Sequence, residues 1–164
     1  MPTSDLVLHE EEYQKIRQVI TRLRAECNAK VVFLVDKNGQ QIAAEGELEA
    51  IDTTALASLA AGNVAATDSL ARLIGEKEFS ILFHEGERDN LHISVVGGRV
   101  ILVVIFDERS SLGLVRLRVK KGSAELAAIL DVMLKKSAAP RKAAAGGSPF
   151  AEITDEDIDK LFSD

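Results

Sequence analysis

The segment DTTALASLAAGNVAATDSLARLIG, residues 52–75, predicts one long helix with two different faces. Residues at spacings of three and four indicate a stripe that faces the core, namely Leu56, Leu59, Asn63, Thr67, Leu70 and Ile74. Small residues surround this stripe, namely Ala57, Ser58, Ala61, Gly62, Ala65, Ala66 and Ser69, and no residue between Asp52 and Asp68 is charged. Small side chains let another backbone approach closely. The helix is therefore either buried on both sides within its own domain or a protein-binding helix.

The other elements follow from hydrophobic periodicity and turn residues. Helical spacing covers residues 10–28 and 112–136, and apolar or alternating runs predict strands at 30–36, 40–45, 79–83, 91–96 and 100–106. Asn38-Gly39 and Gly97-Gly98 indicate hairpin turns, and Asp52 or Thr53 is the expected N-cap of the long helix. Hairpin-linked strands flanked by helices predict a three-layer α/β sandwich around an antiparallel sheet.

Composition limits the classes of function. The 164 residues fit one domain with an appendage, and the single cysteine, Cys27, excludes an internal disulfide and fits a reducing cytoplasm. The net charge is −6, but residues 150–164 carry six acidic residues and one lysine, which leaves only about −1 for the rest. A nearly neutral body disfavours nucleic-acid binding. We expect a cytoplasmic protein without a signal peptide, and no membrane insertion, because the most apolar run, residues 100–106, is short.

The C-terminal part divides in two. Residues 1–136 form the predicted domain, and residues 137–149, SAAPRKAAAGGSP, predict a flexible linker. Residues 150–164, FAEITDEDIDKLFSD, predict a short acidic helix that places Ile158, Leu161 and Phe162 on one face. Such a short helix is marginal alone, so its apolar face favours docking on a partner. A solvated tail is the alternative.

The sequence offers little chemistry for catalysis. His9, His84 and His92 have no metal-ligand spacing with cysteine or acidic partners, and no glycine-rich phosphate loop is present. His92 is expected simply on a face of its strand. We therefore expect no cofactor, no metal and no catalytic residue, and interaction surfaces instead.

Five segments carry a family resemblance, namely AKVVFLVDKNGQ at 29–40, IDTTALASLAAGNVAAT at 51–67, LARLIGEKEF at 70–79, VVIFDERSSLGLVRLRVKK at 103–121 and SPFAEITDEDIDKLF at 148–162. These segments closely resemble the MglB family of bacterial roadblock proteins, which regulate the small Ras-like GTPase MglA. The resemblance implies a roadblock fold of order α-β-β-α-β-β-β-α. Its five-stranded antiparallel sheet has the first and third helices on one face and the long helix on the other.

The resemblance also implies a function in bacterial cell polarity and gliding motility. A homodimer, paired through the long helix and the strand with Phe79, Ile81 and Phe83, binds one MglA-type GTPase in its GTP state. It stimulates GTP hydrolysis without an arginine finger, by repositioning the GTPase's own catalytic residues, and it has no catalytic site of its own. Enrichment at a cell pole is expected. The implied GTPase-binding residues are Ala61, Gly62, Ala65, Asp68, Ser69 and Arg72, and a second contact by the tail involves Phe150, Ile153, Ile158, Leu161 and Phe162.

Other interpretations stay open. A roadblock scaffold would bind a GTPase or polarity complex without stimulating hydrolysis. A sensory domain of similar topology would bind a small ligand in its sheet, although the run ILVVIF at 101–106 predicts a strand filled by protein on both faces. Among the loop arginines, Arg88, Arg99 and Arg109 are the candidates for a charge donated to a partner, and nothing in the sequence selects one of them.

Overall fold

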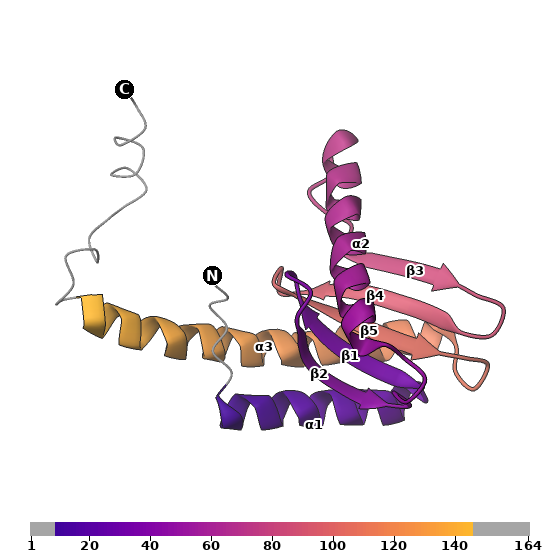
Figure 1. Cartoon of the computed structure of the whole chain (residues 1–164), viewed down its shortest axis with the longest axis horizontal. Coiled ribbons are helices and arrows are strands. Elements are labelled where there is room, and N and C mark those ends of the chain that lie inside the picture. The colour runs from indigo at the N-terminus through magenta and orange to yellow at the C-terminus, as the bar shows by residue number, and fades with distance from the viewer. Residues whose placement is uncertain (1–8, 146–164) are drawn as a thin grey trace.

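The computed structural model describes residues 9–145, and side chains as far as Lys136. Residues 9–145 form five strands and three helices in the predicted order (Figure 1). The strands are β1 (Val31–Asp36), β2 (Gln41–Gly46), β3 (Ile81–Glu85), β4 (Asn90–Val96) and β5 (Val100–Phe106), and the helices are α1 (Glu10–Cys27), α2 (Thr53–Leu73) and α3 (Leu112–Ala145). The predicted tail contacts between Phe150 and Phe162 lie outside the described residues.

One antiparallel sheet lies between two layers of helix. Its strand order is β2-β1-β5-β4-β3, so β1, β5 and β4 are internal and β2 and β3 are the edges. Alternate residues of each strand point to opposite faces. Val32 and Leu34 pack with α1 and α3, whereas Val31 and Phe33 pack with α2. The three-layer arrangement predicted from the sequence is therefore confirmed.

Local signals explain where the elements begin and end. The Asp52 side chain accepts a hydrogen bond from the Ala55 backbone N–H at 3.0 Å, which caps the first turn of α2. In the β1–β2 turn, Oδ1 of Asp36 accepts from the backbone N–H groups of Asn38 and Gln40, at 2.9 and 3.0 Å. Gly39 has a φ of +90° there, a conformation that L side chains rarely adopt.

Helices α1 and α3 lie side by side on the face of the sheet opposite α2 (Figure 1). Gly122 allows this approach, because a Cβ on it would lie 3.3 Å from Cδ2 of Leu23. The buried carboxylate of Glu12 accepts a hydrogen bond from Nζ of Lys136 at 2.7 Å, which joins the first turn of α1 to α3. The glycine inside the predicted helix is thus a packing residue.

Two predicted segments differ from the structure. The strand predicted at 79–83 lies at Ile81–Glu85, because Phe79 still belongs to the connection from α2. Of the linker predicted at 137–149, residues 137–145 belong to α3, and the rest lies outside the described residues. Residues 137–145 contain five alanines, the strongest helix formers, and their propensity continues the helix past Pro140.

The faces of α2 are the main correction. The predicted core stripe included Leu59, Leu70 and Ile74, yet these side chains are 72%, 59% and 69% exposed. Small residues face the sheet instead, and the buried positions of α2 are Ala57, Ala60, Ala61, Val64, Thr67 and Ala71. Alanines allow the helix to approach the sheet closely, so the large side chains are directed outward.

Candidate interaction surface

The side of α2 that faces away from the sheet carries an apolar surface. We define the α2 outer face as Leu59, Gly62, Ala65, Ala66, Ser69, Leu70, Arg72, Leu73 and Ile74, all of which are exposed. Leu73 is 82% exposed, the largest value among the exposed large hydrophobic residues of the described part. Contiguous exposed apolar surface of this kind is typical of a protein–protein contact.

Most of the predicted GTPase-binding residues lie on this face. Gly62, Ala65, Ser69 and Arg72 are spaced along one stripe, and Nη2 of Arg72 donates to Oγ of Ser69 at 3.3 Å. Ala61 does not belong to the stripe. It is only 9% exposed and packs toward the sheet, near the Gly39 turn.

Asp68 borders the α2 outer face without belonging to it. Its side chain is about one-fifth exposed, and Oδ2 lies 4.0 Å from Nζ of Lys37. Oδ1 is buried without a hydrogen-bond partner in the described part of the chain. Because Asp68 points toward the β1–β2 turn, any contact that it makes with a partner would be at the margin of this surface.

The predicted dimer residues divide between two environments. Ile81 is half exposed on the edge strand β3, and Phe79 is 36% exposed just before it. Phe83 is half buried and stacks on Phe106, with ring centroids 6.2 Å apart. Within residues 9–145, strand β3 pairs only with β4, so its outer edge presents unpaired backbone groups.

A polar contact joins α2 to this edge strand. Nδ2 of Asn63 lies 3.2 Å from Nε2 of His84. Asn63 also holds Thr67, whose hydroxyl donates to the Asn63 carbonyl oxygen at 2.8 Å. The α2 outer face and the β3 edge are therefore neighbouring parts of one side of the molecule.

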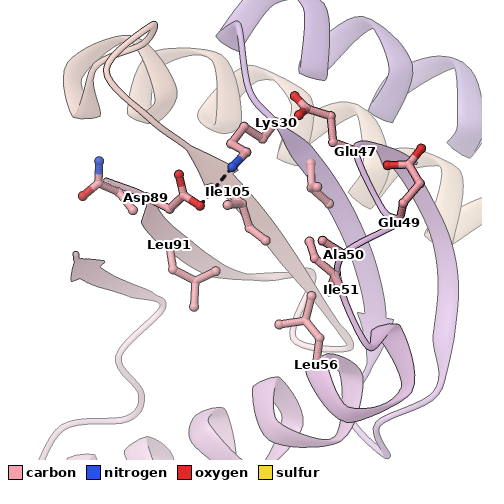
Figure 2. A pocket seen from close by; sticks show the side chains of 11 residues that line it. Lys30, Glu47, Glu49, Ala50, Ile51, Leu56, Asp89, Leu91 and Ile105 are labelled. Atoms are coloured by element: carbon pink, nitrogen blue, oxygen red, sulfur yellow. Dashed lines mark hydrogen bonds and ion pairs between the residues drawn. The ribbon is translucent and has the colours of Figure 1, made fainter. Parts of the chain in front are cut away.

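A pocket of about 510 Å³ lies beside the first turn of α2 (Figure 2). Its apolar wall includes Leu56, Leu91 and Ile105, and its rim carries Glu47, Glu49, Asp89 and Lys30. Nζ of Lys30 binds Oδ2 of Asp89 at 3.0 Å, an interaction that raises the pKa of the lysine (Figure 2). The lining holds no thiol, hydroxyl or imidazole group, and its lysine is paired with Asp89, so the recess suits an apolar side chain of a partner better than a reaction.

The three loop arginines differ in their surroundings. Nε of Arg109 donates to Oδ1 of Asp107 at 3.0 Å, and Nη2 donates to Oε2 of Glu47 at 3.3 Å. The guanidinium lowers the pKa of Asp107, and the two carboxylates raise the pKa of Arg109. Arg88 and Arg99 are exposed in the β3–β4 and β4–β5 turns. Of the three, Arg109 already has carboxylate partners within the chain.

Residues 9–145 hold no group of three or more histidine, cysteine or acidic side chains arranged to bind a metal ion. The same residues form no helix long and apolar enough to span a membrane.

Sequence reasoning missed the large residues of the interaction surface. It assigned Leu59, Leu70 and Ile74 to the core and did not single out Leu73. The helix carries two apolar stripes, one large and one small, and periodicity alone does not say which stripe contacts the sheet. One signal could have identified the buried side. The alanines at 57, 60, 61 and 71, together with Val64, recur at the same spacings of three and four as the large residues, and so form a second candidate stripe for the contact with the sheet.

Comparison with known proteins agrees with this geometry. The model of the Roadblock/LC7 domain matches residues 15–106. The structure of Myxococcus xanthus MglB is 61% identical, with a TM-score of 0.74, and the match covers 78% of this chain and 96% of that one. The gliding protein MglB from Thermus thermophilus is 36% identical, with a TM-score of 0.73 and coverage of 79% and 98%.

A third structure, described as MglB with a tetrameric arrangement, is 33% identical, with a TM-score of 0.75 and coverage of 80% and 99%. No match was found among curated proteins. The domain match spans more than half of the chain, and the three structures are each more than 30% identical over most of both chains. On these grounds the chain belongs to the Roadblock/LC7 family, among the relatives named MglB.

Proposed function

We propose that this protein is a homodimeric regulator of an MglA-type small GTPase. In this proposal one GTPase in its GTP state binds the dimer and hydrolyses GTP faster as a result. The observation that carries the proposal is the α2 outer face, which is exposed, apolar and almost uncharged in a chain 61% identical to Myxococcus xanthus MglB. The Thermus thermophilus relative is described as a gliding protein, which supports a role in motility, and we infer a role in cell polarity from the resemblance to MglB proteins.

In the proposed dimer, the contact between copies uses the side of the molecule that carries the α2 outer face and the β3 edge. Leu59, Leu70 and Leu73 expose large apolar side chains, and burying a leucine contributes about 1.5–3 kcal/mol. The adjacent β3 edge offers unpaired backbone groups to a second copy. The tetrameric arrangement described for a 33% identical MglB supports self-association of this chain.

Repositioning of the GTPase's own residues is the mechanism that fits this surface best. A donated arginine can contribute a factor of about 10³–10⁵ in rate, but it must be free to reach the γ-phosphate. Arg109 is held by Asp107 and Glu47, and the α2 outer face carries one cation, Arg72, which contacts Ser69. Small side chains such as Gly62 and Ala65 instead allow a partner's loops to pack closely and be held in one conformation.

The test is GTP hydrolysis by a cognate MglA-type GTPase with and without the full-length protein. We expect the rate to rise with the protein concentration and to saturate at one GTPase per dimer. Binding without a change in rate would contradict the activator proposal and support the scaffold interpretation. Absence of binding would contradict both.

The arginine mechanism is tested in the same assay at saturating protein. Alanine variants of Arg72, Arg88, Arg99 and Arg109 should each keep most of the maximal rate. Lys121→Ala, an exposed cation on α3 away from the α2 outer face, is the matched control. A loss of about a hundredfold or more in one variant, with binding unchanged, would identify an arginine donated in trans and overturn the repositioning mechanism.

A further inference from the structure

A second pocket lies on the opposite side of the sheet from α2. It has a volume of about 400 Å³ and opens between the β3–β4 edge and the first half of α3. Its polar lining consists of Ser80, His92, Ser94, Arg116, Lys120 and Ser123. The lining contains no acidic side chain, so two cations, three hydroxyl groups and one imidazole surround the same space. The volume lies within the usual range for small-molecule sites.

Two buried groups in the lining have no hydrogen-bond partner in the described part of the chain. His92 is completely buried, and neither of its ring nitrogens is bonded. Ser94 is 6% exposed, and its hydroxyl oxygen is also unbonded. Leaving a buried polar group unpaired costs free energy, so such groups are rare and call for a specific reason.

The sheet register explains why these groups face the pocket. His92 is opposite Phe83 on β3 and Val104 on β5, and Ser94 is opposite Ile81 and Leu102. Phe83, Val104 and Leu102 belong to the core on the α1 and α3 side. His92 and Ser94 therefore point toward α3, from which Arg116 and Lys120 approach.

The two cations come from one face of α3. Arg116 and Lys120 are four residues apart, a spacing that places them one above the other along a helix. Burial and, to a lesser extent, Arg116 lower the pKa of His92, so the ring is neutral at pH 7 and offers one N–H donor. A set of donors with positive charge and no nearby carboxylate matches an anion with several acceptor oxygens.

We propose that this pocket binds a small oxyanion, with a phosphate group of a small molecule as the best match and a carboxylate as the alternative source of the same chemistry. In the bound state Arg116 and Lys120 supply the charge, and His92, Ser94 and Ser123 supply neutral donors. Protein side chains fill both faces of β5, which leaves no room for a ligand there. The proposed site lies over the neighbouring strand β4 instead. Ile81, a residue of the proposed dimer edge, also lines the pocket, but the polar groups of the pocket lie on the other side of the sheet from the α2 outer face, so anion binding is tested without the GTPase.

The experiment is an NMR titration of the full-length protein with inorganic phosphate at constant ionic strength. A parallel titration uses acetate. We expect saturable shifts of the backbone amides of Ser94 and Ser123 and of the His92 ring. Because an anion stabilises the imidazolium, phosphate should also raise the pKa of His92. Saturation by acetate alone would support the site and assign it to carboxylates.

Variants decide whether the pocket is responsible. Arg116→Gln and Lys120→Gln remove charges from exposed residues, so the fold should be unchanged, and each should weaken binding at least tenfold. Lys121→Gln, the exposed neighbour outside the pocket, is the matched control and should change affinity less than twofold. The titration extends to an anion concentration of tens of millimolar and at least about 50-fold above that of the protein. The proposal is wrong if neither phosphate nor acetate saturates these signals within that range. Equal weakening of binding by all three variants would also overturn the proposal, because it would show that the anion is attracted nonspecifically to the positive charge of α3.

Discussion

The orientation of α2 makes opposite predictions for two adjacent residues. Leu59 is 72% exposed, whereas Ala60 is 4% exposed against the sheet. Replacing Leu59 with Ala should therefore change little in the folded subunit, and replacing Ala60 with Leu should be harmful. Periodicity of the large residues predicts the reverse, because it assigns Leu59 to the core.

The magnitudes separate the two cases. Full burial of a leucine contributes about 1.5–3 kcal/mol, and only about a quarter of Leu59 is covered, so Leu59→Ala should cost less than about 1 kcal/mol. A leucine in the core would cost about 3–5 kcal/mol when replaced by Ala. Ala60→Leu inserts three carbon atoms between the helix and the sheet, and overpacking of this kind costs about 1–3 kcal/mol.

Urea unfolding followed by circular dichroism measures both changes. The measurement should be repeated over a range of protein concentrations, because a residue in a contact between copies stabilises the fold only where the dimer is populated. We expect any loss in Leu59→Ala to shrink on dilution and the loss in Ala60→Leu to persist. The orientation would be refuted by a loss above about 2.5 kcal/mol for Leu59→Ala at every concentration, with Ala60→Leu unchanged.

Three other perturbations test the binding face, the α1–α3 ion pair and the tail. Ala65→Arg combined with Ser69→Arg places two charges on the exposed α2 outer face, and pull-down with GTP-loaded GTPase should show lost binding. Because the proposed dimer contact uses the same face, sedimentation of the same sample checks whether the dimer persists, and normal activation of hydrolysis by a folded dimer would contradict the assigned surface. The hydrogen bond from Lys136 lowers the pKa of Glu12 below its ordinary 4.5. The ionised carboxylate therefore contributes its full stabilisation above pH 4.5, and this contribution is lost as the pH falls through the pKa of Glu12 in the folded protein. The stability difference between wild type and Glu12→Gln, measured by thermal unfolding, should therefore shrink below about pH 4.5, and a constant difference from pH 7 to 3 would contradict the ion pair. Deleting residues 150–164 should lower GTPase affinity by about 1–3 kcal/mol in titration calorimetry, because a tethered second contact adds avidity, whereas equal affinities would make the tail a solvated appendage.

The element order could be predicted because its signals are local. The cap at Asp52, the Asn38-Gly39 turn and the apolar run of β5 each depend on residues close together in sequence. Boundaries failed where two local signals compete. Pro140 and the glycines that follow it predict a linker, but the alanines up to residue 145 continue α3. At β3, alternation of Phe79, Ile81 and Phe83 suggests a strand, but pairing with β4 begins only at Ile81.

The candidate sites depended more on tertiary structure. Gly62, Ala65, Ser69 and Arg72 were predicted from the resemblance and are exposed on α2, but Ala61 faces the sheet. The oxyanion pocket had no sequence signal at all. His92 comes from a strand and Arg116 from a helix beyond the next strand, and only the packing of α3 against β4 brings them to the same space.

The sequence by itself determined the elements, their order and the α/β class, because caps, turns and periodicity act between near neighbours. The tertiary structure decided which side of α2 contacts the sheet. Both stripes of that helix are apolar, so burial of either would be favourable, and hydrophobic pattern does not distinguish them. Ala57, Ala60 and Ala61 form the contact because their size lets the helix lie close to Phe33 and Val103, and Leu59, Leu70 and Leu73 therefore remain exposed.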